Sequence, residues 1–250
     1  MSNPYFQFKQ FTIWHDRCAM RVGTDGVLLG AWARPPHSRG VGEERPLRVL
    51  DVGTGTGLIA LMMAQRLPTA QVVAVEIDPA AASQAADNVA RSAFSSRVEV
   101  VCQDFRTWQA DEGFDLVVSN PPFFTETLRS PDAGRSLARH VGGLDFGSLL
   151  SHSLDLMQPW ARMALIVPAQ AEGALIGQAG HLGLRTTHRT EVYTRPQKAC
   201  RRVLLELGRE EAPSAVPVAA CLEDRLFITD AAGQFTPDYI SLTRDFYLYF

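Results

Sequence analysis

The sequence of 250 residues lacks the features that mark several large classes of protein. Its four cysteines lie far apart and form no C-x-x-C pair, which argues against a disulfide framework and against a zinc site. No apolar run reaches about 18 residues, so we expect no membrane-spanning helix. The first residues, Met1 to Tyr5, lack the basic and apolar regions of a signal peptide. We therefore expect a cytoplasmic protein with no metal and no membrane partner.

The chain also lacks a strong excess of charge of either sign. Its formal net charge is −3, which argues weakly against a protein that coats nucleic acid without sequence preference. This value does not exclude a local basic patch, because phosphate contacts depend on local charge. Hydrophobic residues make up 46% of the chain and charged residues 20%, the usual balance of a globular protein. Composition alone leaves the function open.

Short apolar runs alternate with helical patterns through the middle of the chain. Strands are predicted over residues 47–52, 72–75, 98–101, 114–119, 163–167 and 203–207. Helices are predicted over residues 58–67, 79–91, 149–157 and 169–181. This alternation predicts an α/β fold with a doubly wound, mostly parallel sheet and helices on both faces. Residues 34–46, rich in Pro, Gly and charge, are predicted to join a short N-terminal extension (1–46) to the main domain (47–250).

A glycine-rich turn follows the first predicted strand and opens a helix. Its residues, Asp51-Val52-Gly53-Thr54-Gly55-Thr56-Gly57, have the form D-x-G-x-G-x-G. Glycines let the backbone turn tightly and approach a ligand without a Cβ clash. A dinucleotide fingerprint has the spacing G-x-G-x-x-G, which would place its third glycine at Leu58, so the spacing disfavours an NAD-linked oxidoreductase.

The form of this turn resembles the first motif of class I methyltransferases, which have a Rossmann-like fold. In that family the glycines accommodate the methionine part of S-adenosylmethionine, a cofactor without a pyrophosphate. The resemblance implies cofactor-binding roles for four residues of the turn: Asp51, Gly53, Gly55 and Gly57.

Acidic residues follow the next two predicted strands. A carboxylate at Glu76 can accept hydrogen bonds from both ribose hydroxyls of a nucleoside, and the alternative is a solvated acid beside Asp78. Asp78 itself is predicted to cap the helix that follows. In the resembling family, an acid at the position of Asp104 accepts from the adenine amino group and an apolar neighbour, here Phe105, covers the ring. The alternative for Asp104 is an exposed loop acid.

The tetrapeptide Asn120-Pro121-Pro122-Phe123 follows the fourth predicted strand and closely resembles the catalytic motif of amino-methyltransferases. By itself it would be an ordinary proline-rich turn. An adenine amino nitrogen is a poor nucleophile, because its lone pair is delocalised into the ring. The Asn120 side-chain oxygen and the Pro121 carbonyl oxygen are predicted to accept hydrogen bonds from its two hydrogens. This would direct the lone pair at the methyl group of the cofactor. Asn120 is also expected to contact the cofactor. Prolines fix the turn, and Phe123 is predicted to stack on the flat target.

The stretch from Arg21 to Trp32 precedes the first strand of the main domain. In the resembling proteins it helps to close the cofactor pocket, and Thr24 and Asp25 are the candidates for that role. The alternative is that one of them caps the apolar helix that follows.

The order of these features resembles one family through most of the chain, the bacterial tRNA(Val) adenine-N6-methyltransferases. The resemblance covers residues 15–32, the glycine-rich turn, the Val-Glu-Ile-Asp stretch, the Asn-Pro-Pro-Phe motif and the strand near residues 201–207. It implies that S-adenosylmethionine methylates the N6 amino group of adenine 37, next to the anticodon of a tRNA substrate. Many adenine-N6 enzymes carry Tyr where this chain has Phe123. Guanine-N2 methyltransferases of ribosomal RNA share the motif and stay as a rival class, as do glutamine-N5 methyltransferases of translation factors.

Basic residues give independent support for RNA. Between residues 185 and 209, seven Lys/Arg oppose two Glu, a local charge of +5. The candidates for phosphate contacts are Arg195, Lys198, Arg201 and Arg202 in this stretch and Arg129 after the catalytic motif. A solvated basic surface is the alternative. A non-catalytic RNA-binding module is a further alternative, but the presence of Asn120 and Glu76 argues against it.

Overall fold

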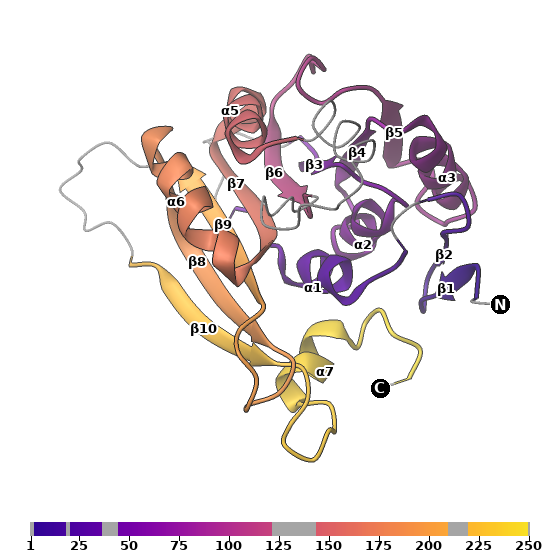
Figure 1. Cartoon of the computed structure of the whole chain (residues 1–250). Coiled ribbons are helices and arrows are strands. Elements are labelled where there is room, and N and C mark those ends of the chain that lie inside the picture. Colours follow the sequence, from indigo (N-terminus) through magenta and orange to yellow (C-terminus); the bar gives the residue numbers. More distant parts are fainter. Residues whose placement is uncertain (1–2, 19–20, 37–44, 122–143, 210–219, 250) are drawn as a thin grey trace, which may run out of the picture.

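The computed structural model describes the chain except residues 1–2, 19–20, 37–44, 122–143, 210–219 and 250. Within the described residues, the centre is a sheet of eight strands in the order β10-β8-β9-β7-β6-β3-β4-β5 (Figure 1). The strands are β3 (Arg48–Val52), β4 (Gln71–Glu76), β5 (Val98–Cys102), β6 (Phe114–Ser119), β7 (Met157–Pro168), β8 (Leu184–Tyr193), β9 (Arg202–Arg209) and β10 (Leu222–Phe227). Strand β9 runs antiparallel to β7 and β8, and the other neighbouring pairs are parallel. The predicted doubly wound, mostly parallel sheet is confirmed.

Helices cover both faces of this sheet (Figure 1). Their bounds are α1 (Thr24–Trp32), α2 (Leu58–Arg66), α3 (Pro79–Ala90), α5 (Phe146–Leu156), α6 (Glu172–His181) and α7 (Pro237–Thr243), with a short 3-10 helix η1 (Ala169–Ala171) before α6. One buried cluster joins residues of α1, α2, α3 and α7 to one face, and a second joins α5 and α6 to the other. In β6, Leu116 belongs to the first cluster and Val117 to the second, because side chains of a strand alternate between its faces. A strand buried on both faces is therefore mostly apolar, and the Leu-Val-Val run makes β6 evident in the sequence.

Strands β8 and β10 are not evident in the sequence. In β8, buried residues alternate with half-buried polar ones, so no continuous apolar run marks it. Strand β10 forms the edge of the sheet and is mostly exposed. The structure also adds a hairpin of β1 (Tyr5–Gln7) and β2 (Thr12–Trp14).

The N-terminal segment shares the core of the main sheet. Phe8, Ile13 and Leu29 are buried in the same apolar cluster as Leu61 of α2. Helix α3 begins at Pro79, and the Asp78 side chain accepts a hydrogen bond from the Ala80 N–H (2.9 Å), which confirms the predicted cap. In the described part of the chain, no helix is both long and apolar enough to cross a membrane.

Candidate functional site

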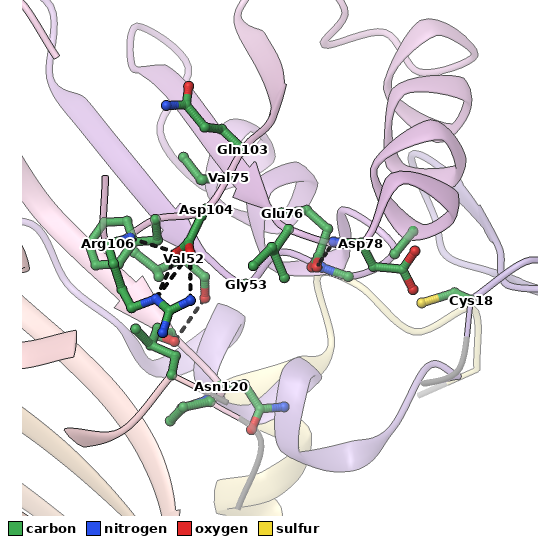
Figure 2. Close-up of a pocket in the computed structure, with 17 residues that line it drawn as sticks. Cys18, Val52, Gly53, Val75, Glu76, Asp78, Gln103, Asp104, Arg106 and Asn120 are labelled. Carbon is green, nitrogen blue, oxygen red and sulfur yellow. Dashed lines mark hydrogen bonds and ion pairs between the residues drawn. The ribbon is translucent and has the colours of Figure 1, made fainter. Parts of the chain in front are cut away.

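A cavity of about 290 Å³ lies at the carboxyl ends of β3, β4, β5 and β6 (Figure 2). Parallel strands end at the same edge of a sheet, and open α/β sheets bind their ligands there. The lining contains these sequence-predicted residues: Gly53, Gly55, Glu76, Asp104, Phe105, Asn120 and Pro121. Residues 122–143, which include Pro122, Phe123 and Arg129, lie outside the described part of the chain. The fold thus gathers residues from four separate strand ends around one cavity.

The glycine-rich turn leaves its cavity side open. Gly53 (φ 69°) and Gly55 (φ 57°) adopt the left-handed conformation that disfavours other residues, and a Cβ added to either would meet no protein atom within 4 Å. Gly57 (φ 80°) precedes α2 and does not line the cavity; a Cβ added there would lie 3.4 Å from that of Ala85 on α3. Gly53 and Gly55 therefore face the ligand space, whereas Gly57 lies beside α3 and serves the left-handed backbone conformation before α2.

Asp51 lies beneath the turn and does not line the cavity. Its side chain is fully buried, and Oδ2 accepts hydrogen bonds from the Thr54 hydroxyl (2.5 Å) and from the Ala60 N–H in the first turn of α2 (3.0 Å). Burial raises the pKa of Asp51 to about 7, although these two hydrogen bonds act to lower it. Asp51 thus joins the turn to the start of α2.

The buried Asp51 predicts a pH-dependent stability. Between about pH 4 and pH 7 the folded state keeps a proton that the unfolded chain releases, so the free energy of unfolding falls as the pH rises through this window, by up to about 1.4 kcal/mol per unit. We expect Asp51→Asn to remove this contribution, so that the variant gains stability relative to the wild type from pH 5 to pH 7. Urea unfolding of both proteins at several pH values measures this difference in stability. Asp111→Asn, which changes an exposed carboxylate, is the control. A pH-independent difference between wild type and Asp51→Asn would contradict the prediction.

Glu76 ends β4 and connects two loops of the cavity. Its Oε2 accepts from the Gly55 N–H (2.8 Å), and its Oε1 accepts from the Asp78 N–H (3.0 Å). The next residue, Ile77, lines the cavity although 48% of it is exposed. Ile77 was missed in the sequence, where its signal is an apolar side chain placed between two acids just beyond a strand.

Asp104 follows β5 and pairs with Arg106, which also lines the cavity and was missed in the sequence (Figure 2). The guanidinium donates to both carboxylate oxygens, with Nε 3.0 Å from Oδ1 and Nη2 2.6 Å from Oδ2. These bonds lower the pKa of Asp104, so the carboxylate stays ionised at neutral pH. Phe105 is buried beside it, and the His152 ring of α5 packs edge-on against it at 4.8 Å. Asp104 and Phe105 thus place a hydrogen-bond acceptor next to an apolar ring.

Asn120 is held close to the glycine-rich turn by the residue before it. The buried Ser119 hydroxyl donates to the Val52 carbonyl (2.8 Å), which ties the end of β6 to the end of β3. In Figure 2, Asn120 lies apart from Glu76 and Asp104, so its amide borders another part of the cavity. A polar amide and two carboxylates are thus distributed around one space.

The N-terminal segment reaches the cavity at Cys18, a residue missed in the sequence. The Arg17 N–H donates to Gln84 of α3 (3.1 Å), which holds this segment along that helix. Thr24 and Asp25 do not line the cavity, and neither caps α1, because Gly23 occupies the N-cap position. Asp25 instead forms an ion pair with Arg202 (2.7 Å).

The basic candidates of the β8–β9 loop lie at the same edge of the sheet. Arg202, the first residue of β9, pairs in register with Pro168, the last residue of β7, so the loop before it lies beyond the carboxyl end of β7. Arg195, Lys198 and Arg201 are exposed. Arg202 is half-buried, and its guanidinium contacts Asp25 of α1.

Comparison with known proteins finds relatives whose sequences align with this chain over nearly the full length of both. Residues 41–141 match the family model of the methyltransferase small domain. The chain is 44% identical over 250 residues to a tRNA1(Val) (adenine(37)-N6)-methyltransferase of Bacteroides thetaiotaomicron, covering 100% of this chain and 99% of the relative. An Aeromonas hydrophila protein of the same name is 43% identical over 98% of both chains.

Two solved structures that share the fold at low sequence identity are a predicted methyltransferase and a methylase. A predicted O-methyltransferase from Agrobacterium tumefaciens superimposes with a TM-score of 0.62 at 22% identity, covering 88% of this chain and 96% of that one. A ribosomal protein L11 methylase from Lactobacillus delbrueckii has a TM-score of 0.52 at 17% identity, covering 80% and 84%. At this identity the likeness establishes the fold alone.

Proposed function

Because the chain belongs to the family of tRNA1(Val) (adenine(37)-N6)-methyltransferases, we propose that it transfers a methyl group from S-adenosylmethionine to the N6 amino group of adenine 37 in tRNA(Val). The observation that carries this proposal is the cavity that joins the open glycine-rich turn and two carboxylates to Asn120-Pro121. A tRNA substrate also favours a cytoplasmic location for the protein.

The cavity residues fit the chemical groups of S-adenosylmethionine. Gly53 and Gly55 leave the turn open on the cavity side, where the methionine part would bind. The Glu76 carboxylate suits the ribose hydroxyls, and the ionised Asp104 suits the adenine amino group. Phe105 provides an apolar face for the adenine ring, and Asp51 and Gly57 shape the turn from below. When bound, the cofactor supplies an electrophilic methyl group on a sulfonium.

The reaction depends on positioning of the target amine. The Asn120 side-chain oxygen and the Pro121 carbonyl oxygen accept its two hydrogens, which directs the nitrogen lone pair toward the methyl group. Phe123, beyond the described residues, is assigned to stacking on the target base. A fixed geometry of this kind supplies much of a rate enhancement, because binding has already brought the two reactants together in the reactive orientation.

Exposed cations near the cavity suit the tRNA backbone. Arg195, Lys198 and Arg201 are assigned to phosphate contacts, and so is Arg129, which lies outside the described residues. We assign Arg202 chiefly to anchoring the β8–β9 loop, because its charge is already paired with Asp25.

The test offers purified protein and labelled S-adenosylmethionine to unmodified tRNA(Val) transcript, ribosomal RNA and release factors. We expect label in tRNA(Val), released on digestion as N6-methyladenosine, and none in a matched transcript whose adenine 37 is replaced by guanine. Label in ribosomal RNA as N2-methylguanosine, or in the glutamine of a release factor, would overturn the target. Binding of tRNA without transfer to any acceptor would indicate a binding module.

A further inference from the structure

Two loops lie side by side at the end of the sheet that carries the cavity (Figure 1). One is the β8–β9 loop (194–201), and the other is the segment between β10 and α7 (228–236). The Ile228 N–H donates to the Tyr193 carbonyl (2.9 Å), and the Thr229 N–H donates to the Thr194 carbonyl (3.1 Å). These backbone bonds make the two loops one surface.

The β8–β9 loop presents cations without acids. Arg195, Lys198 and Arg201 are exposed, and residues 194–201 contain no Asp or Glu. Among the ion pairs of the described residues, none involves these three side chains. The ion pair of Arg202 with Asp25 holds the end of the loop against α1. Exposed cations on a loop that is held at one end suit an anionic partner.

The neighbouring segment presents an aromatic ring. Phe235 is 49% exposed, and Tyr239 of α7 stacks against its ring at 5.2 Å between centroids and 27° between planes. The backbone holds the ring in place, because Phe235 pairs with Thr229 and the Thr236 N–H donates to the Ile228 carbonyl (3.1 Å). Arg195 reaches the same segment, since a Cβ added to Gly233 would lie 3.8 Å from its Nη2. Arg195 therefore lies against the segment that carries the ring.

We propose that these two loops form a docking surface for a single-stranded part of the RNA substrate, with Phe235 stacking on an unpaired base and Arg195, Lys198 and Arg201 binding the neighbouring phosphates. The inference rests on the proposed function and adds a base contact that the basic residues alone do not provide. Strands β7 and β9 separate β6 from β8, so at about 4.8 Å per strand the β8–β9 loop lies roughly 10–14 Å from the end of β6 that carries Asn120. The end of β10, which leads to Phe235, lies one strand further, at about 19 Å. A few unpaired nucleotides bridge this distance. Stacking on an aromatic ring is tolerant of base identity, as a surface beside the target base requires.

The ring is tested by measuring the Kd of fluorescently labelled, unmodified tRNA(Val) transcript. Phe235→Ala is expected to weaken binding about tenfold without changing its salt dependence, because stacking involves no counterion release. Phe235→Leu, which keeps an apolar side chain, should lose as much, and Phe235→Tyr should restore the affinity. The control is Tyr249→Ala, which removes an aromatic ring that is 87% exposed outside this surface. The Kd of S-adenosylmethionine should stay unchanged in all four variants.

The cations are tested by the slope of log Kd against log salt concentration. Replacement of Arg195, Lys198 and Arg201 by glutamine should weaken binding and reduce the slope by about 2, since each contact to a single strand contributes about 0.7. Arg91→Gln, an exposed cation at the end of α3, should leave the slope unchanged.

Three results would overturn this surface. If Phe235→Ala and Phe235→Leu bound tRNA like the wild type while the wild type methylated it, the proposed function would stand without the surface. A change in oligomeric state of Phe235→Ala, with tRNA affinity unchanged, would assign the ring to a contact between two copies of the chain. Absence of methyl transfer from the wild type to tRNA would overturn the proposed function and the surface with it.

Discussion

Replacement of Asn120 by alanine is expected to lower the single-turnover rate of methyl transfer about 10²–10³-fold, the usual cost of losing a preorganised polar group at the reacting centre. Asn120 lines the cavity, and the Ser119–Val52 hydrogen bond fixes its position at the end of β6. Alanine removes the side-chain oxygen that accepts a hydrogen of the target amine. It leaves Gly53, Gly55 and Glu76 in place, so the Kd of S-adenosylmethionine should change less than about threefold.

Asn120→Asp is the matched control for this prediction, because a carboxylate keeps an acceptor of similar size. It should retain more activity than Asn120→Ala. The rate is measured with labelled cofactor and saturating tRNA(Val), and the Kd by calorimetry. If Asn120→Ala lost cofactor binding and kept the rate at saturating cofactor, the assignment of Asn120 to the target amine would be wrong.

Asp115→Ala is expected to lower the free energy of unfolding by about 3 kcal/mol, since it removes a buried carboxylate that accepts four hydrogen bonds, two of them from a guanidinium. Asp115 is fully buried at the start of β6. Its carboxylate accepts from Arg45 (2.8 and 3.1 Å), from the Arg48 N–H (2.9 Å) and from the Trp160 indole (2.8 Å). These bonds tie Arg45, just before β3, and Arg48, the first residue of β3, to β6.

The pH dependence of this network has a defined sign. Burial acts to raise the pKa of Asp115, but the bonds from Arg45, Arg48 and Trp160 outweigh it and lower the pKa below the ordinary 3.8. The stabilisation is therefore present above about pH 4 and is lost as the pH falls through the folded-state pKa. Urea unfolding at neutral and acidic pH measures both effects. Glu112→Ala, which removes an exposed ion pair with Arg48, should cost less than about 1 kcal/mol, and equal losses in the two variants would contradict the network.

Local sequence predicted the buried strands and the glycine-rich turn, because their residue types follow from burial and backbone conformation. Strands β3, β4, β6 and β7 are largely buried on both faces, so short apolar runs mark them. The spacing of Gly53, Gly55 and Gly57 predicted a turn that the structure confirms, since all three have positive φ. The strand ends then placed Glu76, Asp104 and Asn120 at one cavity, because parallel strands finish at a common edge.

Only the tertiary structure decided how individual polar residues are used. The resemblance implies a cofactor-binding role for Asp51, but the fold buries its side chain beneath the turn, away from the cavity. Asp25 and Arg202 are 177 residues apart, and no local pattern predicts their ion pair. Cys18 reaches the cavity because α3 holds the segment before it. The sequence by itself therefore determined the sheet and the cavity edge, which follow from periodicity and spacing. The burial and pairing of single side chains depend on which distant elements pack against them, and that information exists only once the chain has folded.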